Sequence, residues 1–205
     1  MSFGFDAPED TGGSSKFLDQ PGTYHLIIMA VHEGAMANGK PMTGGGFCAT
    51  LSAVAGTVKE QEERELNMSF FNGKLDSKDR GEFARKKQAS FFIAADLMTP
   101  GQLGQAGLKI DLQQAVGRQI VATLEVGKDK DGHPTKFLEL SYANVYHVDD
   151  PRAANFPKCA NSLALLPNSL RHDAAYFAKL LEKRAPAGNA PTRVPQLTAS
   201  QLADL

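Results

Sequence analysis

The chain has 205 residues, of which 42% are apolar and 22% charged, and its formal net charge is −1. These proportions are typical of a globular protein and exclude a protein that is basic as a whole, so any polyanion-binding site must be a local patch. Its two cysteines, Cys48 and Cys159, are too few for a disulfide scaffold or a cysteine-rich zinc module. We therefore expect a reducing, cytoplasmic environment.

Signals for export or membrane insertion are absent from the sequence. The first residues contain no basic segment followed by an apolar one, as a signal peptide would. The longest apolar stretches, Leu26–Val31 and Phe91–Ala95, are far shorter than the roughly 20 residues that cross a bilayer. We expect a soluble protein without a membrane partner.

The first half of the chain has the pattern of a flexible arm followed by three strands. Residues 1–20 include a Gly-Gly-Ser-Ser run and predict a flexible N-terminal arm. Alternation and β-branched or aromatic residues predict strands at Thr23–Glu33, Phe47–Val54 and Leu66–Phe71. The charged run Lys59–Glu65 is the expected tip between the second and third strands.

A helix and a second hairpin are predicted next. The stretch Asp79–Met98 lacks proline, and four of its apolar residues share one helical face: Phe83, Phe91, Ala94 and Met98. Alternating residues then predict strands at Gln119–Val126 and Phe137–Val148, joined by a turn that contains Asp131-Gly132. The alternation of the last strand shifts near Asn144, as at a β-bulge.

Five strands with a helix between the third and fourth predict a mainly β protein with helices. This is the order of elements in an OB-fold, a five-stranded Greek-key barrel, which we place at residues 21–150. Residues 151–185 form a predicted C-terminal extension, with a helix from Ser169 to about Arg184. Three prolines in residues 186–205 predict a disordered tail.

A search for catalytic motifs yields one partial match. Gly34–Lys40 fits the first seven positions of a phosphate-binding loop, but Pro41 stands where that loop needs a magnesium-binding hydroxyl. An inter-strand loop is the simpler interpretation, and a nucleotide-binding assay of Lys40→Ala would test the alternative of an NTPase. The histidines and acidic residues form no catalytic or metal-ligating pattern in the sequence. We therefore expect no enzymatic activity, no cofactor and no metal.

Binding of a single nucleic-acid strand needs cations for the phosphates and aromatic faces for the bases. The predicted cationic residues gather after the third strand and on the second hairpin: Lys74, Arg80, Arg118, Lys128, Lys130 and Lys136. The predicted stacking residues are Phe71 and Phe137, which fall opposite the inward-facing sets, together with Tyr24. The alternative for each lysine and arginine is a solvent-exposed charge without a ligand, and the alternative for each aromatic residue is a ring in the core.

Several segments resemble a family of phage- and prophage-encoded single-stranded DNA-binding proteins, formerly a domain of unknown function. They are PGTY at Pro21–Tyr24, GKPM at Gly39–Met42, Val116–Gly132 and its return KFLELSYANVYHV at Lys136–Val148. The resemblance covers about residues 20–150. It implies an OB-fold protein that coats single-stranded DNA in replication or recombination without catalysis, and it makes Gly39-Lys40-Pro41 an ordinary loop.

The sequence therefore predicts a non-enzymatic, largely sequence-independent single-stranded DNA-binding protein of the cytoplasm, the host cytoplasm if phage-encoded. The tail could dock another replication or recombination protein, or mediate homo-oligomerisation, through Leu197, Leu202 and Leu205. The alternative is a β-barrel module for protein interaction or phage assembly, which the near-neutral charge also fits. A preference for RNA instead of DNA stays open, because sequence does not show how a 2′-hydroxyl is read.

Overall fold

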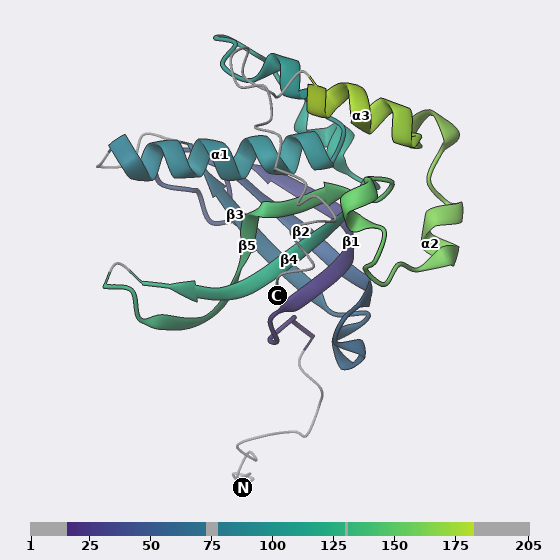
Figure 1. Ribbon diagram of the computed structural model, residues 1–205. Coiled ribbons are helices and arrows are strands. Elements are labelled where there is room, and N and C mark those ends of the chain that lie inside the picture. Colours follow the sequence, from purple (N-terminus) through teal and green to yellow (C-terminus); the bar gives the residue numbers. More distant parts are fainter. Residues whose placement is uncertain (1–15, 73–77, 130, 183–205) are drawn as a thin grey trace, which may run out of the picture.

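The computed structural model describes residues 16–72, 78–129 and 131–182, and its central feature is a five-stranded antiparallel sheet (Figure 1). The strands lie in the order β3-β2-β1-β4-β5. Their bounds are Gly22–Glu33 for β1, Gly46–Gly56 for β2, Glu65–Phe71 for β3, Gln119–Lys128 for β4 and Pro134–His147 for β5. The sheet, with helices packed against it, confirms the predicted mainly β architecture with helices, and its open five-stranded form is consistent with a barrel-like fold.

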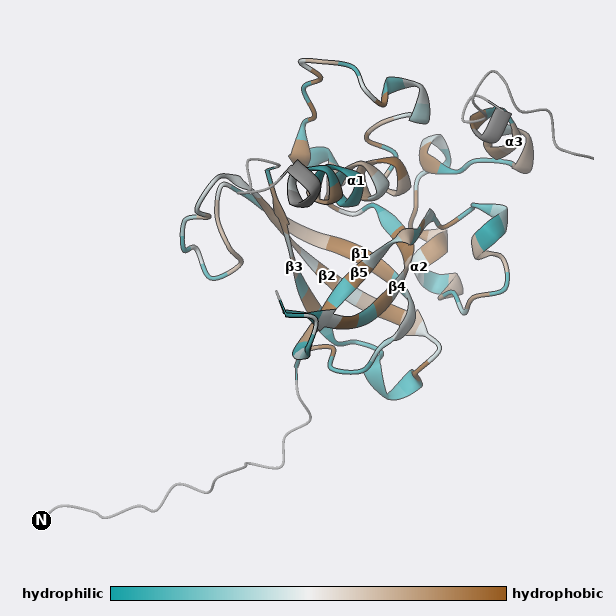
Figure 2. Cartoon of the chain, turned by 60° about the vertical axis from the view of Figure 1, so that its left-hand side comes forward, coloured by the Kyte–Doolittle hydropathy of each residue, from teal (hydrophilic) through white to brown (hydrophobic). Residues whose placement is uncertain are grey.

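Alternation along the strands separates the core from the surface. In β3, the side chains of Leu66, Met68 and Phe70 are buried, whereas Asn67 and Phe71 are exposed. Most of the buried apolar residues of the described chain lie in the strands, and Figure 2 shows hydrophobic residues along them. β1 is central and pairs with both β2 and β4, so it organises the sheet.

Helix α1, Lys78–Ala94, runs across the strands (Figure 1) and packs mainly against β5. Its buried Phe91 joins an aromatic cluster, with ring centroids 4.6 Å from Phe70 and 5.8 Å from Phe47. The helix ends four residues before the predicted Met98. Asp96 adopts a left-handed conformation (φ 56°) that an α-helix cannot continue through, although apolar burial extends past it to Met98.

The β4–β5 hairpin projects beyond the rest of the sheet (Figure 1). Its register shifts between Ala122 and Leu124, which pair with Val145 and Leu140. The extra residues on β5 include Asn144, so the predicted irregularity there is confirmed. The bend lets one end of β5 pack in the core while the other end follows the projecting hairpin.

The C-terminal extension packs on the sheet through a second apolar cluster. Val121 of β4 points away from the main core and meets Val148, Ala153 and Leu166. The extension contains α2, Ala160–Ala164, and α3, Ala174–Glu182. The latter begins five residues after the predicted Ser169, because the carboxylate of Asp173 accepts the amide of Tyr176 and caps the helix there.

Short 3₁₀ helices occupy the connections. They are η1 Lys59–Gln61, η2 Pro100–Gln102, η3 Leu112–Ala115, η4 Pro151–Ala153 and η5 Asn168–Leu170. In the part of the chain that the structure describes, no helix combines the length and apolarity needed to cross a bilayer.

Residues 16–20, which the sequence assigns to a flexible arm, are attached to the sheet. Phe17 forms a parallel β-bridge with Glu65, and Leu18 is buried. The amide of Asp19 donates to the side chain of the fully buried Gln61. Residues 1–15 and the predicted tail, 186–205, lie outside the described residues.

Candidate nucleic-acid interface

A groove of about 1160 Å³ runs along β3, between this strand, α1 and the start of β5. In the described sheet β3 and β5 are edge strands that do not pair with each other, so the groove follows the seam where the barrel-like sheet is open. Its lining is largely apolar and contains side chains of both faces of β3. Such an open, apolar groove suits an extended ligand better than a compact one.

Four exposed phenylalanines line the groove, and one of them is Phe17, which precedes β1 and has an exposed fraction of 48%. The other exposed fractions are 40% for Phe71 at the end of β3, 47% for Phe83 on α1 and 66% for Phe137 on β5. Phe83 meets Tyr142 edge to face, with ring centroids 5.2 Å apart. Exposed rings on three separate elements around one groove offer several faces for planar ligands.

Two lysines accompany these rings. The ammonium of Lys136 lies 5.5 Å from the centroid of the adjacent Phe137 ring. The ammonium of Lys87 lies 5.9 Å from the Phe70 ring and 4.0 Å from the carboxylate of Glu139. Burial lowers the pKa of Lys87, an effect that Glu139 opposes. Lys136 has no ion pair within residues 16–72, 78–129 and 131–182 and is the cation available to an anionic ligand.

The carboxylates at the groove are already paired. Glu139 faces Lys87, and Glu65 lies 3.1 Å from the ammonium of Lys16. Asp19 contacts the guanidinium of Arg64, also at 3.1 Å. These pairs reduce the repulsion that an anion entering the groove would meet, since each carboxylate has its own counter-ion.

The structure brings together three of the predicted binding residues. Phe71, Lys136 and Phe137 line the same groove. Lys128 is exposed at the end of β4, in the hairpin that carries Phe137. Lys74 and Lys130 lie outside the described residues, and Arg80 belongs to α1 but its side chain is not among those described.

Two predicted binding residues have other roles. Tyr24 is fully buried, and its hydroxyl donates to the carbonyl of Gln20, so it is a core residue without a free face. The guanidinium of Arg118 donates to the carbonyl of Gln114 and lies 3.4 Å from the carboxylate of Asp96, where it ties the segment before β4 to the end of α1. Neither residue lines the groove.

Phe83 and Lys87 are groove residues that the sequence analysis did not identify. It placed Phe83 on the buried face of the helix because its spacing from Phe91 and Ala94 fits that face. However, Phe83 lies near the start of α1, in the run GEFARKK, where a single apolar residue stands among charges. Its isolation among charged neighbours was the available signal for exposure.

The loop with the partial phosphate-binding motif hydrogen-bonds to itself. The amide of Met36 donates to the carbonyl of Lys40, and the amide of Gly39 donates back to Met36. The amide of Lys40 donates to the side chain of Asn38. Because these amides are engaged within the turn, they do not converge on a phosphate, and the geometry is that of a connecting loop.

The hairpin tip holds three potential metal ligands, Asp129, Asp131 and His133, within 4.8 Å of one another. All three are exposed, and one carboxylate oxygen of Asp129 already accepts the amides of Asp131 and His133. This is the hydrogen bonding of an Asx turn, which accounts for the cluster without a metal.

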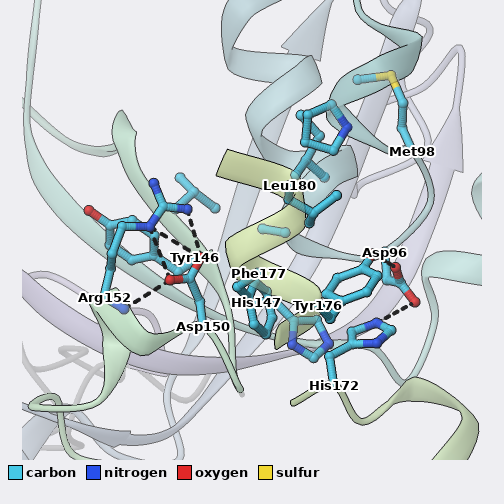
Figure 3. A pocket seen from close by; sticks show the side chains of 14 residues that line it. Asp96, Met98, Tyr146, His147, Asp150, Arg152, His172, Tyr176, Phe177 and Leu180 are labelled. Carbon is cyan, nitrogen blue, oxygen red and sulfur yellow. Dashed lines mark hydrogen bonds and ion pairs between the residues drawn. The ribbon is translucent and has the colours of Figure 1, made fainter. Parts of the chain in front are cut away.

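A second, much smaller cavity of about 40 Å³ lies where α3 meets the sheet (Figure 3). His172 stacks on Tyr176 with centroids 3.8 Å apart, and its Nε2 lies 3.1 Å from a carboxylate oxygen of Asp96. His147 packs between His172 and Phe177, and burial, followed by the charge of His172, lowers its pKa. The cavity has room for about three water molecules, so we interpret the cluster as a structural contact between α3 and the sheet.

A buried polar network also joins the extension to the sheet. The amide of Cys159 donates to Nδ1 of His25, whose Nε2 lies 3.0 Å from the side-chain oxygen of Gln119. The Gln119 side-chain nitrogen in turn donates to the carbonyl of Ser162 at 2.6 Å. Because Nδ1 of His25 accepts a hydrogen bond, the ring is neutral with its proton on Nε2, and burial lowers its pKa accordingly.

A scan against models of protein families gives no match for this chain, and a search of curated proteins likewise finds no relative.

Proposed function

We propose that this protein binds single-stranded DNA in the groove between β3, α1 and β5. The observation that carries the proposal is the convergence of Phe71, Phe83 and Phe137 on one open groove beside Lys136. Bases of a single strand stack on aromatic rings, and each stack contributes about 1–3 kcal/mol whatever the base. Paired bases of a duplex cannot stack in this way, so we expect binding that is strand-specific and largely independent of sequence.

The strand order supports an OB-fold. A meander of β3, β2 and β1, followed by a β4–β5 hairpin that pairs through β1, is the order of strands in this Greek-key barrel. α1 lies between β3 and β5 along the chain, at the position of the OB-fold helix. Members of this fold bind oligonucleotides over the face of strands 2 and 3 and with the loop between strands 4 and 5. The groove is lined by β3 and by the start of β5, next to that loop.

The predicted cations fit the same site. Lys136 and Lys128 are carried by the hairpin, and Lys130 lies in its turn along the sequence. Lys74 and Arg80 fall between Phe71 and Phe83 in sequence, close to two of the groove rings along the chain. Together with the resemblance to phage and prophage proteins, this supports a non-catalytic role in cytoplasmic replication or recombination.

Fluorescence anisotropy of a labelled oligo-dT, repeated with duplex DNA and across a salt series, tests the proposal. We expect binding of the single strand alone, and an affinity that falls as the salt concentration rises because cations are released from the phosphates. An oligo-U of equal length tests whether the 2′-hydroxyl is tolerated.

Two variants locate the site. Phe137→Ala should weaken binding by about 5- to 150-fold, the range for loss of one base stack. Lys136→Met should reduce the slope of log affinity against log salt by about 0.7, the value for one phosphate contact to a single strand. Matched controls are Leu165→Ala, which truncates another exposed apolar side chain, and Lys179→Met on α3; both should bind normally.

Absence of oligo-dT binding even at low salt would refute the proposal. The groove would then favour the alternative of a protein-interaction module, because its apolar lining also suits a polypeptide.

A further inference from the structure

The outer edge of β3 presents backbone groups to the groove. The amide of Glu65 donates to the carbonyl of Lys16, and its carbonyl accepts the amide of Leu18, so both groups point away from β2. Backbone groups alternate in direction along a strand, so those of Asn67 and Ser69 point the same way. Over the described ranges neither of these two residues has a backbone hydrogen bond on that side.

The groove follows this edge and not one face of the strand. Its lining includes Asn67 and Ser69 from one face of β3 and Met68 and Phe70 from the other. The opposite side of the groove is formed by α1 and the start of β5. Because these elements stand close to the edge, the groove suits a single extended segment better than the surface of a folded partner.

A polypeptide strand is the ligand whose chemistry matches the edge. An added strand pairs its own amides and carbonyls with the free ones and places alternate side chains on one side. The sugar-phosphate backbone of DNA offers acceptors but no donors, so it leaves the carbonyls of Asn67 and Ser69 unsatisfied. Residues 16–18 already bind the start of the edge as a strand does, through the parallel bridge between Phe17 and Glu65.

Both ends of the free edge are defined. At its start, residues 16–18 occupy the backbone groups of Glu65. At its end, the carbonyl of Phe71 accepts a hydrogen bond from the side chain of Gln88 at 2.6 Å. From Asn67 to Phe71 the strand rises about 13 Å, at about 3.3 Å per residue, so the edge fits an added strand of about five residues.

The surroundings of the edge specify the side chains of that strand. Those on the core side would rest on the buried Met68 and Phe70, beside Leu138 of β5, so apolar side chains fit there. The carboxylates at the groove each face a cation of their own, whereas Lys136 has no ion pair among the described residues. A carboxylate in the occupant complements that charge.

We infer that the edge of β3 binds a short extended segment of a partner protein, with apolar residues at alternate positions and one acidic residue that faces Lys136. The segment adds a strand in the open seam between β3 and β5. The inference does not depend on DNA binding. Where the proposed function also holds, the segment and single-stranded DNA exclude each other, because both occupy the same groove.

Selection from a random library of seven-residue peptides displayed on phage, with the full-length protein as bait, tests the chemistry of the occupant. We expect enriched sequences in which apolar residues alternate and an aspartate or glutamate is present. The enriched peptide should bind Lys136→Met about two- to fivefold more weakly than the parent chain, the range for an exposed ion pair. Replacing its acidic residue by the matching amide should remove that difference.

Enrichment without an alternating pattern, or no enrichment at all, would overturn the proposal. Equal affinity of the acidic peptide for the parent chain and for Lys136→Met would also overturn it. The control Lys179→Met removes a lysine of α3, outside the groove, and should bind the peptide as the parent chain does.

Amide hydrogen exchange measured by NMR locates the bound peptide. With free peptide at ten times its dissociation constant, about nine-tenths of the molecules carry it, so the amides of Asn67 and Ser69 should exchange about tenfold more slowly. The exposed Lys109, which does not line the groove, is the control whose amide should be unaffected. Peptide binding without slower exchange at Asn67 and Ser69 would overturn the added strand. Protection of these amides that grows with protein concentration, without peptide, would overturn the proposal in favour of a second copy of the chain.

Oligo-dT anisotropy with the enriched peptide separates this inference from the proposed function. Displacement of bound oligo-dT by the peptide would support both. Peptide binding by a protein that does not bind oligo-dT would support the added strand and refute DNA binding. Oligo-dT binding by a protein that enriches no alternating peptide would do the reverse. Simultaneous binding of both ligands would overturn their placement in one groove.

Discussion

Replacing Gln119 by methionine tests whether the C-terminal extension is fastened to the sheet as the structure shows. Gln119 lies at the start of β4 and joins His25 of β1 to the carbonyl of Ser162 in α2. Methionine has a similar length and fills the same space but offers neither hydrogen bond. The change therefore isolates the polar network from the packing around it.

The expected loss follows from the groups left behind. Nε2 of His25 and the carbonyl of Ser162 would each lose a partner in a buried environment, at about 1–3 kcal/mol apiece. We expect the free energy of unfolding to fall by about 2–6 kcal/mol. This is a large part of the 5–15 kcal/mol by which a typical domain is stable.

Urea denaturation followed by far-ultraviolet circular dichroism at pH 7.5 measures the loss. The control Gln105→Met replaces an exposed glutamine and should change stability by less than about 0.5 kcal/mol. A Gln119→Met protein within about 1 kcal/mol of the parent would show that His25 and Ser162 stay solvated. The extension would then not be seated on the sheet.

Three further outcomes follow from the structure. The free energy of unfolding should decline as the pH falls below about 6.5. Burial lowers the pKa of His25 and His147 in the folded state, so below that pH the unfolded chain binds more protons than the folded one. Urea titrations at several pH values test this, and a free energy of unfolding that stays constant between pH 7.5 and 5 would contradict it. Phe70→Ala should cost about 3–5 kcal/mol in urea, since its ring is buried against two others, and a loss below 1 kcal/mol would refute that packing. Arg118→Gln should lower the melting temperature but leave the affinity for oligo-dT unchanged, because Arg118 pairs with Asp96 and does not line the groove. Weaker DNA binding by a variant of unchanged stability would show that Arg118 contacts DNA.

Strand positions could be predicted from the sequence because alternation is a local property. In β3, the inward set Leu66, Met68 and Phe70 and the exposed Phe71 agree with the pattern of their residue types. The end of α1 could not be predicted in this way. Burial continues to Met98 after the helix has ended, so apolar spacing alone overestimates its length.

The errors at the site arose from contacts between distant segments. The sequence predicts Tyr24 as a stacking residue, but β1 is the central strand and Tyr24 and His25 are both buried, so alternation does not mark an exposed face there. Arg118 was assigned to DNA because nothing near it in sequence shows its pairing with Asp96. The exposure of Phe137 could be predicted from alternation, because the opposite face of its hairpin strand supplies the buried residues.

The open seam between β3 and β5 makes the groove a part of the core. Leu66, Met68 and Phe70 are buried core residues and line the groove as well, so an occupant rests directly on the packed interior. A molecule that binds only the folded chain raises the free energy of unfolding. The increase is about 2.7 kcal/mol when the free concentration of that molecule is a hundred times its dissociation constant. A melting-temperature screen of oligonucleotides and peptides against this protein would therefore rank ligands of the groove without a label or an assumed partner.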